Sequence, residues 1–373
     1  MRILQTNFHT KWGGQAAAIF HLARALASRG HDMTIAAPPG SNLAERATEA
    51  GLDVFDRAHF QARGSFTGLF YDARQLQRLM RSRGFDVIHT NGSKDGWAAS
   101  AALYSVGLPS VTIRTRHNLK RIRRHLGNRW FHGRATDHVV AVSNAIRNHT
   151  IASNLCPPDK VTVIHPALDL DAFQPKRVSR QCFRTEIGAS DGQLLIGTSA
   201  RLEQQKGIDL LLRGFARIAR HEPNALLVIA GDGKEQMPLM QLAHELGISA
   251  RVCFCGFRAD VPSVLAGLDL FALPSRTEGF GIAIVEAMAM GLPVVASRVG
   301  GVLDIITNGL DGVLVPLEDI EALTTAILEL LHNPEARRRL GLAARQRAQV
   351  FSPQAAAQQH EALYERLIRE KKR

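Results

Sequence analysis

The chain has 373 residues, of which 45% are hydrophobic and 21% are charged. This length is too great for one compact core and suits two domains, and the balance excludes a largely disordered protein. Lys and Arg number 46 against 34 Asp and Glu, so the formal net charge is +12. Such a surplus favours anionic partners such as nucleic acid, acidic lipid or phosphorylated glycans, without choosing among them.

The first residues enter a strand-like run, "RILQTNF", with no apolar core typical of a signal peptide. No uninterrupted apolar run reaches the roughly 18 to 20 residues of a membrane span. We therefore expect a soluble, cytoplasmic protein. The four cysteines show no second pair at metal-ligand spacing, so we expect reduced structural thiols and no metal site.

Short apolar runs alternate with amphipathic stretches along nearly the whole chain. In the first half the runs are "RILQTNF", "MTIAAP", "FDVIHTN", "PSVTIRT", "HVVAVS" and "VTVIHP". In the second half they are "LLIGTSA", "ALLVIAG", "VCFCGF", "LDLFALP", "PVVAS" and "GVLVP". Near-continuous Val, Ile and Leu strands that alternate with helices predict parallel sheets covered on both faces.

The periodicity lapses once, where prolines and charges gather near the middle of the chain. The predicted fold class is α/β, with two doubly wound Rossmann-like domains facing a central cleft. We expect an N-terminal domain at 1–168, a linker at 169–184 and a C-terminal domain at 185–351. A last helix would occupy 352–373, with Ser352 as its cap.

Glycines and cations follow several of the predicted strands. Gly13 and Gly14 lead into a helix, where paired glycines let a backbone approach a ligand; an ordinary strand–helix turn is the alternative. Arg201 and Lys206 suit a diphosphate, although they could also be solvated surface cations. Gly231 ends the next strand in the same way and could approach the same ligand.

The stretch "SRTEGFGIAIVEAMAM" places two carboxylates around a predicted helix start. The amides of Phe280, Gly281 and Ile282 would point at an anion. Glu278 precedes the helix, and Glu286 lies within its apolar segment, where a carboxylate is costly unless something binds it. Sugar hydroxyls would satisfy both carboxylates without a protein cation. The alternative is one acid at the helix dipole and one facing solvent.

In combination these motifs resemble the retaining glycosyltransferases of family 4, which have the two-domain GT-B architecture. The resemblance rests on "EGFGIAIVE" followed by "AMAMGLPVVAS" and "GG", and covers nearly the whole chain. It includes the early "GG", "DVIHTNG", "RTRHN", "AVSNAI", "ARLEQQKG", "IAGDG" and "CGF".

The resemblance implies roles for individual residues. Glu278 would hold hydroxyls of the donor sugar, Glu286 the ribose hydroxyls, and Arg201 with Lys206 the diphosphate. His117 matches the family histidine that faces the donor sugar across the cleft. On its own, His117 would more often be a strand-end histidine with a local partner.

Three further positions follow from the same resemblance. Gly13 and Gly14 match the loop near the diphosphate and the acceptor, and Phe257 precedes the base-binding segment. The implied activity moves a hexose, with retention, from a nucleotide diphosphate sugar to a membrane- or lipid-linked glycan such as lipopolysaccharide core. The sugar nucleotide is a co-substrate, and no other cofactor is expected.

Three other functions remain as alternatives. A UDP-sugar epimerase of similar fold would share the donor site. An oxidoreductase is disfavoured because no complete glycine fingerprint with a following acidic residue is present. A non-enzymatic basic protein would bind nucleic acid in a salt-dependent manner, but it would leave Glu278 and Glu286 unexplained.

The segment from Arg114 to Arg134 has eight cations and no acidic residue. As a helix it would have one apolar stripe, formed by Leu119, Ile122, Leu126 and Trp130. Such a segment is typical of a helix on an anionic membrane surface. The expected membrane-facing residues are Lys120, Arg121, Arg123, Arg124 and Trp130. We thus expect peripheral association with the inner face of the cell membrane. The alternative is a stripe packed on its own sheet beside solvated arginines.

Overall fold

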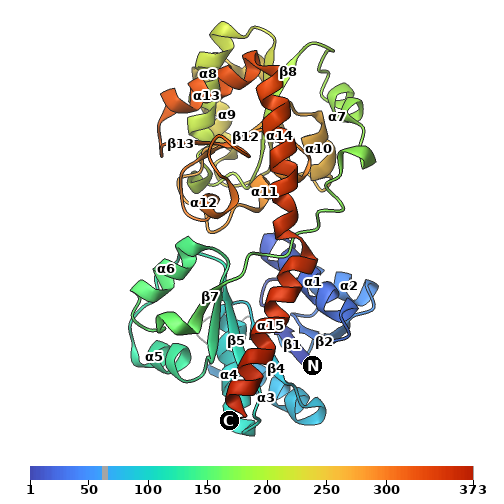
Figure 1. The fold of residues 1–373 in the computed structure, drawn as a ribbon, viewed down its shortest axis with the longest axis vertical. Coiled ribbons are helices and arrows are strands. Elements are labelled where there is room, and N and C mark those ends of the chain that lie inside the picture. Colours follow the sequence, from blue (N-terminus) through green and yellow to red (C-terminus); the bar gives the residue numbers. More distant parts are fainter. Residues whose placement is uncertain (61–65, 373) are drawn as a thin grey trace. The chain divides into compact units, whose positions relative to one another are not determined.

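The computed structural model describes residues 1–60 and 66–372, which form two compact units. Unit 1 contains residues 1–168 and 351–373, and unit 2 contains residues 169–350. Each unit is built on one sheet of parallel strands with helices between successive strands (Figure 1). The observed architecture therefore confirms the predicted α/β class with two Rossmann-like halves.

The sheet of unit 1 has seven strands in the order β3-β2-β1-β4-β5-β6-β7. Their bounds are β1 Arg2–Thr6, β2 Asp32–Ala36, β3 Asp53–Phe55, β4 Val87–Thr90, β5 Val111–Arg116, β6 His138–Ala141 and β7 Val161–Val163. Every strand except β3 overlaps a run expected from the sequence, with bounds that differ by one residue at the start of β2 and at the end of β5. The three residues of β3 are only half-buried, so they lack the apolar run that identifies the others.

Helices cover both faces of this sheet. They are α1 Gly14–Ser28, α2 Asn42–Glu49, α3 Phe66–Arg83, α4 Ser93–Val106, α5 Leu126–Gly133, α6 Asn144–Ala152 and α15 Pro353–Lys371. Neighbouring residues of a strand point to opposite faces. On β1, Ile3 accordingly belongs to the core cluster that contains α1 and α15, and Leu4 to the cluster that contains α3 and α4. The strands are apolar on both faces because both faces are buried.

The sheet of unit 2 has six strands in the order β10-β9-β8-β11-β12-β13. Their bounds are β8 Leu194–Ser199, β9 Ala225–Ala230, β10 Val252–Gly256, β11 Leu270–Leu273, β12 Val294–Ser297 and β13 Val313–Val315. The helices are α7 Arg180–Glu186, α8 Ile208–His221, α9 Gln236–Glu245, α10 Val261–Gly267, α11 Ile282–Ala289, α12 Val302–Ile305, α13 Ile320–His332 and α14 Pro334–Ala348.

Both sheets reverse their strand order at one point. The reversal lies between β1 and β4 in unit 1, and between β8 and β11 in unit 2. In open parallel sheets the loops that leave the two central strands diverge there, which opens a crevice at the carboxyl ends of the strands. Each unit therefore has one position at which the fold itself favours a ligand.

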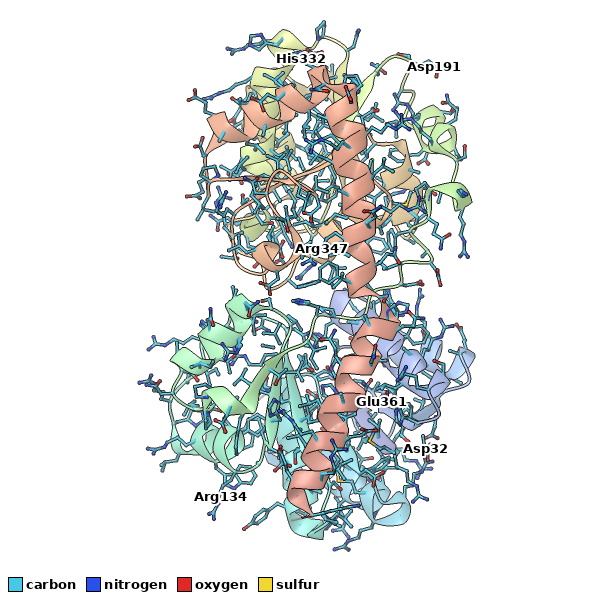
Figure 2. All side chains as sticks on the ribbon, in the orientation of Figure 1. Asp32, Arg134, Asp191, His332, Arg347 and Glu361 are labelled. Atoms are coloured by element: carbon cyan, nitrogen blue, oxygen red, sulfur yellow. The ribbon has the colours of Figure 1, made fainter. Side chains whose placement is uncertain are left out.

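The last helix, α15, belongs to unit 1. Ser352 accepts a hydrogen bond from the amide of Ala355 at 3.4 Å, which confirms the expected cap. Figure 1 shows α15 in red beside α1. Glu361, labelled on α15 in Figure 2, pairs with Arg29 and also with His31 at 2.9 Å. Polar contacts of this kind attach the end of the chain to its beginning.

The expected linker at 169–184 is partly structured. Helix α7 begins at Arg180 and packs on α10. Phe183 on α7 is 1% exposed and lies against Gly267 of α10, where a Cβ would come within 2.5 Å of the phenyl ring. The last five residues of the expected linker therefore belong to a helix that packs in unit 2.

Candidate functional site

A buried ion pair lies where the strand order of unit 2 reverses. Lys206 follows β8, and its Nζ lies 2.5 Å from Oε1 of Glu278, which follows β11. Ser275 donates a hydrogen bond to the same oxygen at 2.9 Å. The two ionised side chains are only 17% and 8% exposed. The expectation that Glu278 needs no protein cation is therefore wrong, because the tertiary fold brings Lys206 to it from a segment 72 residues away.

Two glycines allow the loops around this pair to approach closely. Gly207 has φ +65°, and a Cβ there would lie 2.0 Å from the carbonyl oxygen of Pro274. Gly300 has φ +51°, and its Cβ would lie 2.0 Å from the carbonyl oxygen of Glu278. Any side chain would force these backbones apart. The glycines therefore fix where the Lys206–Glu278 pair stands.

Helix α11 begins directly after this loop. It starts at Ile282, and Gly281 precedes it with φ +116°. Glu286 is half-buried on α11, and its carboxylate has no hydrogen-bond partner among residues 1–60 and 66–372. Burial raises the pKa of Glu286 to about 7. Such a carboxylate gains a partner when a ligand offers it hydroxyl groups.

The structure separates Arg201 from the ion pair. The Arg201 side chain is 70% exposed and bonds Oε1 of Glu203 at 2.9 Å. Exposed pairs of this kind contribute about 0 to 1 kcal/mol, so the guanidinium is free to exchange Glu203 for an anionic ligand. Phe257 is 74% exposed directly after β10. Both side chains keep the surface position that ligand contact requires.

Gly231 has a packing role that the sequence did not indicate. Its φ is +143°, and a Cβ there would lie 1.9 Å from the carbonyl oxygen of Ala200. Its amide donates to the carbonyl of Gly256 at 2.7 Å. The glycine therefore joins the loops that follow β8, β9 and β10, whether or not a ligand approaches it.

Two buried hydroxyls of unit 2 were not expected. Thr198 on β8 and Ser297 on β12 have hydroxyl oxygens buried without a hydrogen-bond partner within the described part of the chain. Each lies in the last two residues of its strand. Small polar residues at strand ends are the only trace of these positions in the sequence.

In unit 1, His117 follows β5 and contacts Asn91, which follows β4. His117 Nε2 lies 3.2 Å from Oδ1 of Asn91. Burial, followed by the nearby His9 and Arg114, lowers the pKa of His117 to about 3. The imidazole is therefore neutral at physiological pH.

Asn91 is the centre of a network that sequence reasoning missed. Its side-chain Nδ2 donates to the backbone carbonyl of Thr6 at 3.1 Å, and its backbone carbonyl accepts from Nε2 of Gln15 at 2.8 Å. Its backbone amide donates to Oδ2 of Asp95 at 3.1 Å, and Asp95 is completely buried. The motif "DVIHTNG" contains Asn91 directly after a buried strand. A polar residue in that position could have identified Asn91 as a candidate site residue from the sequence.

The first glycine pair has a simple local role. Helix α1 begins at Gly14, and Gly13 is its extended N-cap with φ 179°. No atom lies within 4 Å of a Cβ built on Gly13. Steric demands within the protein therefore do not require a glycine at this position.

On β5, Arg116 is unexpectedly buried and Arg114 is half-buried. Arg116 is 7% exposed and donates to the carbonyls of Asn118 and Lys120. Arg114 lies over the Phe131 ring at 4.8 Å, and burial lowers its pKa to about 10. Both arginines of the motif "RTRHN" thus contact the interior of unit 1 rather than project from its surface.

The predicted helical stripe of the basic segment is wrong. Residues 117–125 are not helical, and α5 begins only at Leu126, where the His125 side chain accepts from the amide of Asn128. Leu126 is 83% exposed, while Trp130 stacks on Trp97 with ring centroids 5.8 Å apart. The four apolar residues therefore do not share one helix face.

The cations of this segment also differ in their surroundings. Arg124 donates to the carbonyls of Ser153 and Ala152 at 2.9 and 3.3 Å, which caps the end of α6. Arg121 and Arg123 are exposed, and Arg134 points outward from unit 1 (Figure 2). Arg124 thus stabilises the fold, whereas its neighbours remain available to a partner.

The part of the chain that the structure describes contains neither a cluster of metal-ligand side chains nor a helix that could span a membrane. No group of three or more His, Cys, Asp or Glu side chains could hold a metal ion. Cys253 and Cys255 lie on β10 as expected, with sulfur atoms 3.6 Å apart. No described helix is long and apolar enough to cross a membrane.

Two family models match this chain. The model described as Glycosyltransferase Family 4 matches residues 12–172, and the model described as Glycosyl transferases group 1 matches residues 179–347. The first match covers much of unit 1 and the second most of unit 2. Together they include every expected site residue.

Curated relatives and a solved structure agree with these models. A GDP-mannose-dependent alpha-(1-6)-phosphatidylinositol monomannoside mannosyltransferase of Mycolicibacterium smegmatis is 35% identical over 222 residues, which are 57% of this chain and 58% of that protein. A D-inositol 3-phosphate glycosyltransferase of Saccharomonospora viridis is 31% identical over 293 residues, 72% of this chain and 67% of that protein. The crystal structure of a glycosyltransferase from Rickettsia africae has a TM-score of 0.88 at 19% identity, and 98% of each chain is covered.

Proposed function

Because the chain belongs to glycosyltransferase family 4, with the GT-B fold, we propose that it transfers a hexose from a nucleotide diphosphate sugar, with retention at the anomeric carbon. The observation that carries this proposal is the arrangement at the strand reversal of unit 2. There, Glu278, which is buried in a pair with Lys206, shortly precedes α11, and the Glu286 carboxylate has no partner within the described residues 1–60 and 66–372. A ligand with both hydroxyl groups and negative charge suits these groups best.

Each group has one role in donor binding. Glu278 accepts hydrogen bonds from hydroxyls of the sugar, while Lys206, which is bonded to its carboxylate, faces the diphosphate. Glu286 accepts hydrogen bonds from the ribose hydroxyls. Arg201 exchanges its weak surface partner for the diphosphate. The amides of Phe280, Gly281 and Ile282 lie at the start of α11, where the helix dipole favours negative charge, and Phe257 covers the base.

The chemistry then needs stabilisation of the leaving group more than a general base. The bond between the anomeric carbon and the phosphate oxygen breaks, and the acceptor oxygen bonds to the same face of that carbon. The acceptor proton moves to the leaving phosphate. Lys206, Arg201 and the helix amides stabilise the charge that grows on the diphosphate, usually the largest catalytic contribution. We propose that no metal ion is needed, and that transfer survives EDTA.

We propose a lipid-linked glycan, such as lipopolysaccharide core, as the acceptor, and an acidic membrane surface as the place of reaction. The name of the Mycolicibacterium relative contains a phosphatidylinositol derivative, which is a lipid. In unit 1, Leu126 and Tyr104 are 83% and 80% exposed, and Tyr104 contacts Trp130. The exposed Arg121 and Arg123 supply positive charge nearby in sequence. Aromatic groups beside cations suit the interface of an anionic membrane on the cytoplasmic side.

The donor site is tested by binding. Thermal stability should rise with one class among UDP, GDP and ADP sugars, because a ligand that binds the folded state stabilises it by mass action. Glu286→Ala should weaken binding of that sugar nucleotide about ten- to a hundredfold, the effect of losing a charged hydrogen-bond partner. Glu321→Ala, an exposed acid on α13, serves as the matched control. Unchanged affinity in a folded Glu286→Ala variant would contradict the ribose role.

The membrane surface is tested with vesicles. Arg121→Glu with Arg123→Glu should release the protein from vesicles that contain acidic lipid, since each basic residue near such a surface contributes about 1 kcal/mol. Arg124 is left unchanged because it caps α6. The double substitution Arg217→Glu with Arg220→Glu, on α8 of unit 2, is the control. Equal binding to neutral vesicles would contradict the electrostatic part of the proposal.

A further inference from the structure

The hydrogen-bond network of unit 1 fixes which ring nitrogen of His117 carries the proton. Nδ2 of Asn91 lies 3.1 Å from the carbonyl oxygen of Thr6. A carbonyl oxygen only accepts hydrogen bonds, so the amide nitrogen of Asn91 must face Thr6. The amide oxygen then faces His117, at 3.2 Å from Nε2. Because that oxygen also only accepts, Nε2 must carry the hydrogen.

The other ring nitrogen is consequently a lone-pair acceptor. The ring is neutral, since burial lowers the pKa of His117 to about 3, so only one nitrogen is protonated. Nδ1 therefore has no hydrogen, and it has no hydrogen-bond partner within residues 1–60 and 66–372. The titratable groups that act on the ring are His9 before α1, Arg114 on β5 and His89 on β4.

Asn91 is itself held from three sides. Its backbone amide donates to Asp95 on α4, and its backbone carbonyl accepts from Gln15 on α1. Its side-chain amide donates to the carbonyl of Thr6 on β1. The next residue, Gly92, cannot carry a side chain, because a Cβ would lie 2.3 Å from the Phe8 ring. The side-chain amide of Asn91 therefore has one orientation before any substrate binds.

We propose that Asn91 is a positioning residue that holds His117 as a hydrogen-bond acceptor at Nδ1, facing a hydroxyl group of the sugar substrate. This inference rests on the proposed function, because it assigns His117 a sugar ligand. It adds the polarity of the contact: the hydroxyl donates and the histidine accepts. A contact of opposite polarity would need the other tautomer, which Asn91 excludes.

The polarity is tested with substrate analogues. A deoxy sugar removes the hydroxyl, whereas a deoxyfluoro sugar keeps a weak acceptor but removes the donor. If Nδ1 accepts from this hydroxyl, both analogues lose about tenfold or more in kcat/KM, and to a similar extent. At positions that His117 does not contact, the two analogues need not agree. If no position of the sugar shows equal losses that disappear in His117→Ala, the inference is overturned.

The role of Asn91 is tested by the substitution Asn91→Asp. The carboxylate still accepts from Nε2, but its charge raises the pKa of His117 and favours an imidazolium whose Nδ1–H can no longer accept. The acid limb of the kcat profile should therefore move to higher pH by about one unit or more. Asn118→Asp is the matched control, because it adds the same charge next to His117 without the contact. An unmoved acid limb in Asn91→Asp, or equal shifts in both variants, would contradict the role.

A spectroscopic measurement tests the tautomer without any substrate. In 15N-histidine-labelled wild-type protein, the imidazole of His117, assigned by its loss in His117→Ala, should be protonated at Nε2 and bare at Nδ1 at neutral pH. Protonation at Nδ1 would overturn the inference even if transfer is observed. Conversely, a chain that transfers no sugar but shows the Nε2–H tautomer would contradict the proposed function and retain the role of Asn91.

Discussion

The two strand-reversal points of this protein satisfy their polar groups in different ways. In unit 1, His117 bonds Asn91, and Asn91 is held in place by Thr6, Gln15 and the Asp95 carboxylate. In unit 2, the Lys206–Glu278 pair is buried, and the Glu286 carboxylate has no hydrogen-bond partner within residues 1–60 and 66–372. Protein contacts therefore hold Asn91 and His117 in unit 1, whereas the Glu286 carboxylate of unit 2 gains a partner when a ligand binds.

The same contrast appears in how burial changes the pKa values. Unit 1 contains five histidines whose pKa burial lowers: His89, His117, His132, His138 and His360. In unit 2, burial raises the pKa of Glu286. Burial favours the neutral form in both cases. A histidine loses its neutral form when it binds a proton, whereas Glu286 reaches its neutral form by binding one. Acid should therefore affect the two units differently.

The largest expected effect is a selective loss of stability in unit 1 on mild acidification. A histidine whose folded pKa lies below its unfolded value of about 6.5 stabilises the fold above that pH, and this contribution is lost as the pH falls. Between about pH 7 and pH 5.5, each buried neutral histidine loses about 1 kcal/mol. Hydrogen exchange corrected for intrinsic rates should show weaker protection in unit 1 than in unit 2 at pH 5.5. Equal losses in both units would contradict the contrast.

The next effect concerns the ion pair of unit 2. Lys206→Met leaves a buried carboxylate without its cation and should lower the free energy of unfolding of unit 2 by about 3 kcal/mol. Adding Glu278→Gln should recover much of this loss. Arg201→Met is the control: its side chain is 70% exposed, so the loss should stay below about 1 kcal/mol. Denaturant-dependent hydrogen exchange measures the free energy of unfolding of unit 2 in each variant. Similar losses in Lys206→Met and Arg201→Met would contradict a stabilising role of the buried pair.

The smallest effect is a pH dependence of donor affinity. The pKa of Glu286 is about 7 without ligand, and ribose hydroxyls need its ionised form, so the dissociation constant should rise about fivefold between pH 7 and pH 6. The stability of unit 2 should change in the opposite direction: a folded pKa above the unfolded value stabilises at low pH, and this is lost as the pH rises toward 7. Glu286→Gln should abolish both dependences. Calorimetric titration across this range checks the affinity, and a flat profile in the wild-type protein would refute the role.

The existence of nearly all strands and most of their bounds could be predicted because both faces of each sheet are buried. The run "ALLVIAG" needs no tertiary information to read as a strand, since its apolar residues have no polar alternation. Short, half-buried β3 and the non-helical residues 117–125 escaped prediction. In the second case, local spacing suggested a helix, but Arg116 binds the carbonyls of Asn118 and Lys120 and so holds the chain in a loop.

By itself, the sequence determined that Lys206 and Glu278 follow strands and that Glu286 lies within the helix after Glu278, because each is next to a recognisable apolar run or glycine turn. Only the tertiary structure decided which of them meet. Lys206 reaches Glu278 because β8 and β11 are neighbours at the reversal of strand order, although 72 residues separate the two side chains. Asn91 reaches His117 because β4 and β5 are paired. Hydrogen bonds and ion pairs act over a few ångströms, and distance along the chain does not reveal distance in space until the strands are ordered.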